Sequence, residues 1–64
     1  MVVFPHLCPV CKKYNFTEPF EECPICDWQF DTYQEEFQDK KGVNFVTLNE
    51  AKENYKKYKK SYKV

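Results

Sequence analysis

Four cysteines carry the clearest chemistry in this chain, and they come in two matched pairs. Each pair has the pattern Cys-Pro-x-Cys, and eleven residues separate the first pair from the second. The four are Cys8, Cys11, Cys23 and Cys26. Two tight turns of this kind can face each other and present four sulfurs to one tetrahedral metal ion. The spacing therefore predicts a single four-thiolate site, with zinc as the metal.

The proline at the second position of each pair suits such a turn. In a metal-binding knuckle, meaning a short Cys-x-x-Cys turn, the backbone N–H groups that follow the first cysteine point toward its sulfur. Proline has no N–H and a fixed φ, so Pro9 and Pro24 fit the one position whose N–H is not needed. Hydrogen bonds to sulfur and a divalent cation both favour the thiolate, so all four cysteines are expected to ionise.

Other uses of the cysteines explain the pattern less well. Two disulfides would need an oxidising compartment, but the chain opens Met-Val-Val-Phe-Pro-His and lacks a signal-peptide pattern. A redox Cys-x-x-Cys would need a βαβ scaffold for which there is no room, and it would leave the second pair unexplained. Buried free thiols rarely recur in one tetrapeptide pattern. His6 lies two residues before Cys8, and with four thiolates present we assign it to the surface or to the surroundings of the site.

Length and composition agree with a domain that depends on a metal ion. A chain of 64 residues buries only about 60% of its unfolded surface, which leaves a marginal core. Structural zinc would add about 10–16 kcal/mol of binding free energy to folding. Twelve aromatic residues, against two leucines and one isoleucine, indicate a core of a few large rings. We expect one domain over residues 1–64 with no membrane span.

The formal net charge of zero hides an uneven distribution. Residues 17–39 carry eight acidic groups and no lysine, whereas residues 49–64 carry six lysines and two glutamates. Four thiolates with one divalent cation would add a charge of −2. All ten basic residues are lysine, so the forked guanidinium that favours phosphate and base-edge contacts is missing.

The chain divides into three segments. They are the knuckles and hairpin (1–31), a short helix and loop (32–46), and a C-terminal helix (about 48–62). In the first segment, Val2–Phe4 is predicted as a short edge strand. Lys13–Thr17 and Phe20–Cys23 are predicted to pair as an antiparallel hairpin that brings the knuckles together. Trp28 and Phe30 should point to one face and cover the metal site and the hairpin.

Both predicted helices begin with a capping box. Thr32 and Glu35 would cap a short helix from about Tyr33 to Gln38. Thr47 and Glu50 would cap the C-terminal helix, with Val46 packing against Ala51. Apolar residues recur on one face of this helix at steps of three and four, which makes it amphipathic. They are Leu48, Ala51, Tyr55, Tyr58 and Tyr62.

Together these features predict a small metal-stabilised α+β fold. It is a zinc-ribbon or rubredoxin-like β-hairpin with two cysteine knuckles and a C-terminal amphipathic helix.

The chain resembles the bacterial cysteine-rich CPCC proteins. The resemblance lies in the two knuckles, in Trp28 after the second knuckle, and in the stretch GVNFVTLNEAKENY from Gly42 to Tyr55, and it covers about residues 6–58. It implies a compact metal-binding domain, often a small stand-alone bacterial or phage-borne protein, and brings no enzymatic activity. Val10 stands where the family commonly has a third cysteine, so the resemblance implies that the outer pair of that knuckle ligates. Gln29 and Phe30 replace acidic residues common in the family.

The sequence predicts a protein that is not an enzyme. Four thiolates close the coordination shell, whereas catalytic zinc needs an open position. No Ser-His-Asp set or deaminase signature is present, and the single glycine rules out a glycine-rich phosphate loop. We therefore expect a cytoplasmic, non-enzymatic binding module with a protein partner and no small-molecule substrate.

Two functions from other classes compete with this hypothesis. Rubredoxin-like electron transfer would use iron in the same four-thiolate site, although Lys12 and Asp27 stand where such knuckles usually have glycine. A nucleic-acid surface could form from lysines and tyrosines of the last segment. These are Lys52, Lys56, Lys57, Lys59, Lys60 and Lys63 with Tyr55, Tyr58 and Tyr62. We favour tyrosines that pack inward, because the net charge is neutral and arginine is absent.

Two surfaces are candidates for a protein partner. One is the acidic stretch Asp27–Asp39 with the aromatic residues Trp28, Tyr33 and Phe37. The other is the tyrosine-edged C-terminal helix.

Overall fold

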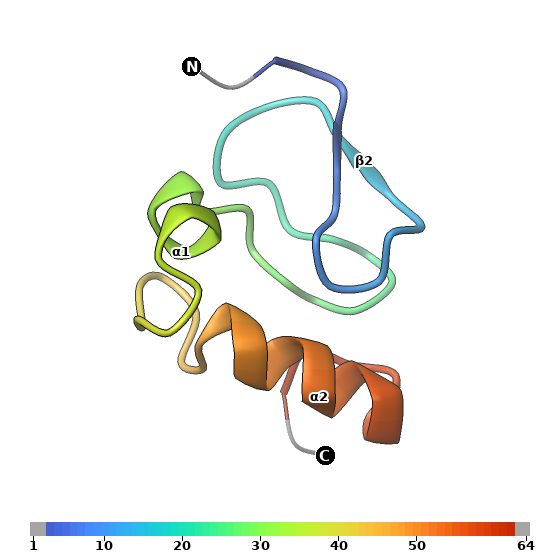
Figure 1. Ribbon diagram of the computed structural model, residues 1–64. Helices are drawn as coiled ribbons and strands as arrows, with labels where there is room; N and C mark the ends of the chain where they lie inside the picture. The colour runs from blue at the N-terminus through green and yellow to red at the C-terminus, as the bar shows by residue number, and fades with distance from the viewer. Residues whose placement is uncertain (1–2, 63–64) are drawn as a thin grey trace.

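The computed structural model describes residues 3–62, in which four short regular elements are joined by turns and loops. The elements are β1 (His6–Leu7), β2 (Asn15–Phe16), α1 (Thr32–Glu36) and α2 (Leu48–Tyr58). Figure 1 shows α2 lying across one end of the molecule, below the loops that carry the knuckles, with α1 to one side. Within residues 3–62, no helix has the length and apolar character needed to cross a membrane.

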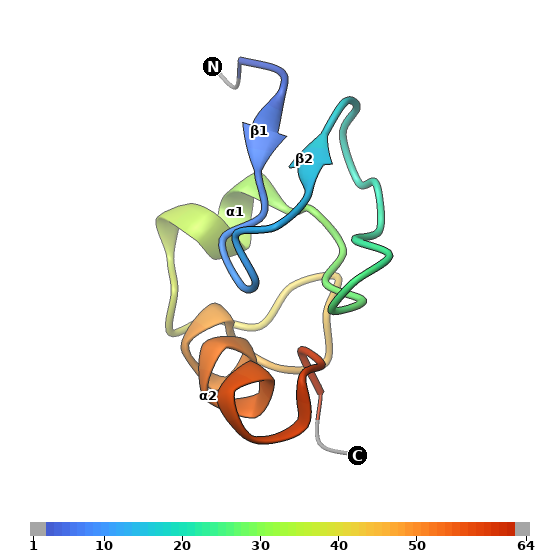
Figure 2. The ribbon, with the colours of Figure 1, turned by 90° about the vertical axis from the view of Figure 1, so that its right-hand side faces the viewer.

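The β-structure is arranged differently from the predicted hairpin. β1 pairs antiparallel with β2, with His6 opposite Phe16, so this ladder closes around the first knuckle (Figure 2). Around the second knuckle, Glu22 and Gln29 form a similar antiparallel bridge. The predicted hairpin between the two knuckles is therefore wrong, because each Cys-x-x-Cys turn reverses the chain and closes its own ladder.

The predicted N-terminal edge strand is also displaced. Val3 and Phe4 belong to no strand, and Val2 lies outside the described residues. The first strand begins instead at His6, one residue after Pro5, which lacks the N–H that a ladder uses.

Ten apolar residues form the buried core, and four of them are the cysteines. The other six are Val10, Phe16, Trp28, Phe30, Leu48 and Ala51. Phe30 stacks on Phe16 with 5.1 Å between ring centroids and meets the ring of Phe4 edge-on. Trp28 and Phe30 are buried in the same cluster as the cysteines, as expected for residues that cover the site. The cysteines therefore make up a large share of a small core.

Helix α1 has a different N-cap from the predicted one. The Asp31 side chain accepts a hydrogen bond from the Tyr33 N–H at 2.9 Å, and Asp31 is the N-cap. Its second oxygen accepts from the Val43 N–H at 3.2 Å, so a contact distant in sequence also fixes this carboxylate. Glu35 turns toward His6 instead of capping the helix. The predicted capping box at Thr32 is thus wrong, and the helix ends at Glu36, before the predicted Gln38.

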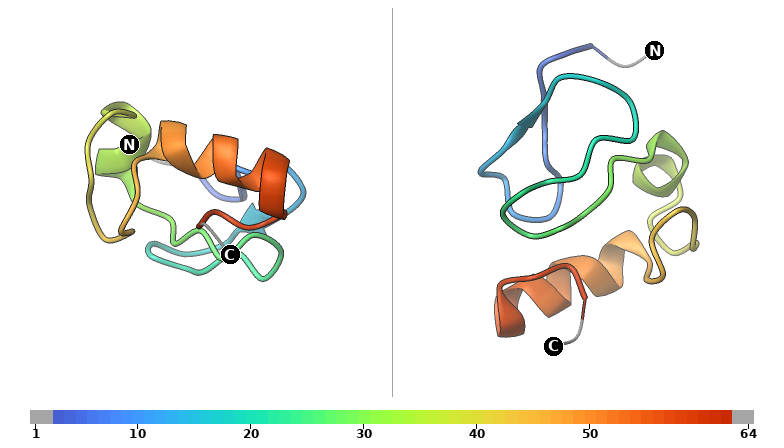
Figure 3. Two further views of the ribbon diagram at one scale, coloured as in Figure 1. Left: turned by 90° about the horizontal axis from the view of Figure 1, so that it is seen from below. Right: turned by 180° about the vertical axis from the view of Figure 1, so that it is seen from behind.

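Helix α2 begins as predicted and ends four residues early. Both hydrogen bonds of the capping box between Thr47 and Glu50 are present, which confirms that prediction. The helix stops at Tyr58 because Lys59 adopts a left-handed conformation, with φ of 61°, and its N–H bonds to the carbonyl of Tyr55. Residues 59–62, called here the C-terminal tail, turn back along α2 (Figure 3). Tyr62 therefore does not lie on the helix.

A buried glutamine ties the loop between the helices to the rest of the fold. Gln34 Nε2 donates to the carbonyl oxygens of Lys40 at 3.1 Å and Val46 at 2.9 Å. Its Oε1 accepts from the backbone and side-chain nitrogens of Asn44 at 3.2 Å and 2.8 Å. The Asn44 side chain in turn exchanges two hydrogen bonds with the backbone of Gln29, just after the second knuckle. This network fixes the start of α2 relative to the knuckles.

Candidate metal centre

The fold brings all four predicted cysteines together as one buried group. Their sulfurs lie within 4.8 Å of one another, and Cys8–Cys26 and Cys11–Cys23 are each separated by 3.6 Å between Sγ atoms. Sulfurs in a disulfide would lie about 2.05 Å apart, and all four cysteines are free. Four sulfurs at about 2.3 Å from a central ion would be about 3.8 Å from one another. The spacing of the donor set therefore fits a tetrahedral metal ion.

The two knuckles have the same backbone construction. The N–H of Lys12 bonds to the carbonyl of Cys8 at 3.0 Å, and the N–H of Asp27 bonds to the carbonyl of Cys23 at 2.9 Å. The Ile25 N–H donates to Cys23 Sγ at 3.4 Å. The first N–H donor to sulfur thus comes two residues after the cysteine, so the proline in between removes no needed donor.

When no cation is bound, hydrogen bonds and burial shift the pKa values of Cys8, Cys11 and Cys26 in different directions. The hydrogen bond from the Cys26 thiol lowers the pKa of Cys8 to about 5, with help from the N–H groups of Cys11 and Val10. The same side-chain bond raises the pKa of Cys26, and burial adds to the rise. Burial raises the pKa of Cys11 to about 11. At neutral pH Cys8 is then a thiolate, while Cys11 and Cys26 are thiols.

We expect metal affinity to fall steeply as the pH is lowered. Cys11 and Cys26, whose raised pKa values keep them protonated, must each lose a proton to become ligands. Release of at least these two protons lowers the affinity by about 100-fold or more for each pH unit of acidification near neutrality. Competition with a chelator of known affinity at several pH values, corrected for the chelator's own protonation, measures the slope. A change of tenfold or less per pH unit would contradict this assignment.

Lys12 and Asp27 follow the two knuckles and have left-handed backbones, with φ of 58° and 66°. This conformation costs an ordinary residue about 1–2 kcal/mol and suits glycine. We therefore expect Lys12→Gly to raise the free energy of unfolding of the metal-loaded protein by about 0.5–1 kcal/mol. Lys12→Ala is the matched control, because it removes the same exposed side chain but keeps the strain. Thermal melts that show no difference between the two variants would refute the prediction.

His6 lies beside the cluster and is not among its ligand atoms. Its Nε2 is 2.7 Å from Oε1 of Glu35, and its ring stacks on Phe30 at 4.7 Å between centroids. His6 thus links β1 to α1, in agreement with its assignment to the surroundings of the site.

Sequence reasoning missed the C-terminal tail as a neighbour of the site. The Ser61 N–H donates to the carbonyl of Cys26 at 2.7 Å, and Lys60 Nζ lies 3.4 Å from the carbonyl oxygen of Ile25. The sequence predicts a helix through these residues because no glycine or proline follows Tyr58 to signal a helix end.

A small α+β fold in which two Cys-Pro-x-Cys knuckles bury four sulfurs defines a four-cysteine metal-binding domain. The model of the cysteine-rich CPCC family matches residues 6–62, and the chain belongs to this family. No curated protein and no solved structure matches the chain.

The stretch from Gly42 to Tyr55, which carried much of the resemblance, has structural roles. Gly42 packs against Asp31 and Gln34, where a side chain would collide. Asn44 belongs to the network around Gln34, and Leu48 and Ala51 enter the core. The stretch therefore places α2 against the cysteine cluster.

Proposed function

We propose that this protein is a non-enzymatic, cytoplasmic binding module whose fold is held by one structural zinc ion. The observation that carries the proposal is the burial of four free cysteines with their sulfurs within 4.8 Å of one another. Four thiolates fill the tetrahedral shell of zinc, so such a site stabilises a fold and leaves no position for a substrate or a reacting water.

Metal analysis of protein purified under reducing conditions tests this function. We expect one zinc ion per chain and a colourless sample, because zinc has a filled d shell. The proposal would fail if the protein carried no metal and gained none when zinc was added. A hydrolytic or transfer activity that depended on a residue other than cysteine would refute its non-enzymatic part.

Iron electron transfer is the second candidate, and one observation favours it. Lys12 and Asp27 adopt the left-handed conformation that glycine usually supplies in rubredoxin-like knuckles. The absence of glycine at these positions therefore does not argue against iron. A red sample whose colour is lost on reduction would identify a ferric four-thiolate site.

The exposed aromatic residues support a protein partner. Trp28 is fully buried, so the first predicted surface narrows to Tyr33 and Phe37, which are 48% and 44% exposed with ring centroids 5.1 Å apart. Glu36 and Asp39 lie beside them in sequence, which favours a partner segment that is basic as well as apolar. We call this pair of rings with its two acidic neighbours the α1 surface.

The tyrosine-edged helix offers fewer free rings than predicted. Tyr55 packs against the core and lies under the ammonium groups of Lys13 and Lys59. Tyr62 lies beyond the end of the helix, where its side chain is 45% exposed and its hydroxyl donates to Asp27. Base stacking would need rings open on one face. This placement supports the α1 surface over a nucleic-acid surface.

Capture of partners from cell extract by the tagged protein tests the α1 surface. We expect the double variant Tyr33→Ala/Phe37→Ala to lose its partner, since interface energy concentrates on aromatic anchors. Phe45→Ala is the matched control, because Phe45 is 95% exposed on another loop. Binding lost only in the Phe45 variant would move the interface to that loop, and binding retained by both variants would refute the proposal.

A further inference from the structure

We propose that Lys60 and the backbone of Ser61 are positioning residues of the metal centre. This proposal rests on metal binding at the four cysteines. In it, residues 60–62 of the C-terminal tail bind residues 25–27 at the second knuckle, and we call this set of contacts the clasp. Docking of the tail therefore raises metal affinity, and metal binding in turn orders the tail.

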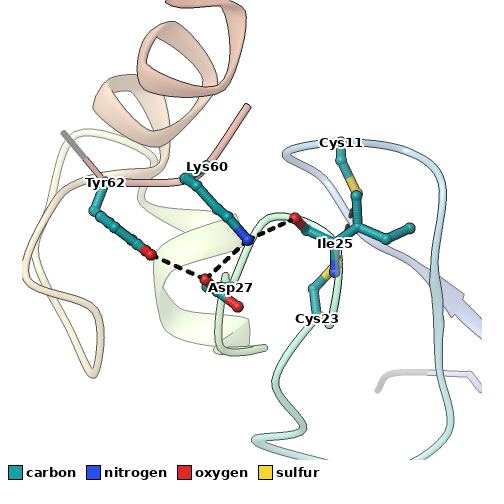
Figure 4. A network of polar contacts seen from close by, with 6 residues as sticks. All are labelled: Cys11, Cys23, Ile25, Asp27, Lys60 and Tyr62. Atoms are coloured by element: carbon teal, nitrogen blue, oxygen red, sulfur yellow. Dashed lines mark hydrogen bonds and ion pairs between the residues drawn. The ribbon is translucent and has the colours of Figure 1, made fainter. Parts of the chain in front are cut away.

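The tail makes four polar contacts with the second knuckle and the residue that follows it, and these contacts converge on three consecutive residues, Ile25, Cys26 and Asp27. Ser61 N–H donates to the Cys26 carbonyl at 2.7 Å, and Lys60 Nζ donates to the Ile25 carbonyl at 3.4 Å. Lys60 also pairs with Asp27 Oδ2 at 3.4 Å, and the Tyr62 hydroxyl donates to the same oxygen at 3.1 Å. Figure 4 shows Lys60 between Tyr62 and the knuckle.

Two of these contacts supply donors to carbonyl oxygens of the turn, those of Ile25 and Cys26. In a knuckle the N–H groups face the sulfur, as Ile25 N–H faces Cys23, so the carbonyl oxygens point outward and need other donors. The peptide that joins Cys26 to Asp27 receives Ser61 N–H at its oxygen and donates its own N–H to the carbonyl of Cys23. Hydrogen bonds in such a chain strengthen one another. The tail therefore extends the hydrogen bonds that close the turn.

The tail is itself anchored to the end of α2. The left-handed cap at Lys59 turns the chain back, and Asn54 Nδ2 donates to the Ser61 carbonyl at 3.1 Å. Lys60 thus reaches the knuckle from a fixed backbone. The Lys60 ammonium also brings a positive charge toward the metal centre, which would carry a charge of −2 with a divalent ion. The Asp27 carboxylate offsets part of this positive charge.

The first knuckle lacks this support. Its inner hydrogen bond from Lys12 N–H to Cys8 matches that of the second knuckle, but within residues 3–62 no donor from the tail reaches it. The asymmetry places the clasp at Ile25, Cys26 and Asp27, and it predicts that a change in the tail alters metal retention although no ligand side chain is changed.

Metal competition with a chromophoric chelator tests the proposal on the full chain loaded with Co²⁺ or Zn²⁺. Lys60→Met keeps the aliphatic stem and removes the donor, and Lys60→Arg keeps the charge and the donors. Lys57→Met is the matched control, since Lys57 is an exposed lysine of α2. A chain that ends at Lys59 removes the whole clasp.

Hydrogen exchange gives a second test of the clasp. We expect exchange at the Ser61 amide to be slow with metal bound and fast after chelation.

We expect Lys60→Met to raise the metal dissociation constant about 10-fold and the truncation to raise it further, up to about 100-fold. Lys60→Arg should restore most of the affinity, and Lys57→Met should match the unmodified protein. The Co²⁺ charge-transfer band should shift in Lys60→Met and not in Lys57→Met, which a loss of general stability would not produce.

Two results would overturn the clasp. One is equal affinity and equal spectra for Lys60→Met and Lys57→Met, and the other is a Lys60→Arg variant that loses as much affinity as Lys60→Met. Failure of the metal-binding function itself would look different, because the unmodified protein would then bind neither Co²⁺ nor Zn²⁺.

Discussion

Removal of the metal with EDTA under reducing conditions is expected to unfold the protein. Four of the ten buried core residues are cysteines, and the other six are too few to hold so short a chain. Structural zinc sites contribute about 10–16 kcal/mol of apparent binding free energy, whereas small domains have net stabilities of about 5 kcal/mol or less. The helical signal in far-UV circular dichroism and the chemical-shift dispersion of the amide NMR signals should both be lost on chelation.

Zinc-saturated EDTA is the control for this experiment, because it has the same ionic character but removes no metal. Addition of zinc to the stripped protein should restore the spectra, since unfolding by metal loss is reversible while the thiols stay reduced. Cys11→Ser should resemble the stripped protein even in excess zinc, because a hydroxyl is a poor zinc ligand of nearly the same size. An unchanged NMR spectrum and melting curve after chelation would refute the central role of the metal.

The parts of the site that follow local rules could be predicted from the sequence. The Cys-Pro-x-Cys spacing fixes each pair of sulfurs within one turn, so the ligand group follows once the two turns meet. The capping box of Thr47 with Glu50 is equally local, since both partners lie within one helical turn. The observed sulfur cluster and capping box show that spacing within a few residues carries geometric information.

The predictions that failed depend on contacts between distant residues. Phe16 could pair with a strand on either side along the chain, and it pairs with His6 because the knuckle between them already reverses the chain. Asp31 replaces Thr32 as the N-cap because Val43, twelve residues away, donates to its second oxygen. Lys59 ends α2 without glycine because Ser61 gains a bond to Cys26 in compensation. Propensity alone could not reveal these compensating contacts.

The two ends of α2 are both linked to the second knuckle. Near its start, Asn44 exchanges hydrogen bonds with Gln29, and beyond its end, Ser61 bonds to Cys26. The first turn of the helix presents Leu48 and Ala51 to the core, and Tyr55 packs against the core farther along. The helix is thus held along its length against the residues that would bind metal. A structural change in the loop before α2 should therefore alter the metal centre.

Replacement of Gly42 by alanine should test that link with a large effect for a substitution away from the cysteines. A Cβ at this position would overlap Asp31 Oδ2 and lie 2.7 Å from Gln34 Cγ. Asp31 cannot move aside without losing its bonds to the N–H groups of Tyr33 and Val43. Overpacking costs about 1–3 kcal/mol, and a lost N-cap costs about 1 kcal/mol more. We expect the metal-loaded melting temperature to fall by about 10 °C or more.

A second substitution separates the collision from other effects of Gly42→Ala. Gly42 does not have a positive φ, so the change should not introduce backbone strain. Asp31→Ser keeps an N-cap hydroxyl and removes the oxygen that the new Cβ would meet. The double variant Asp31→Ser/Gly42→Ala should therefore lose less stability than the sum of the two single variants. Strict additivity, or a Gly42→Ala protein as stable as the original, would show that the loop yields to the added methyl group and does not hold α2 rigidly.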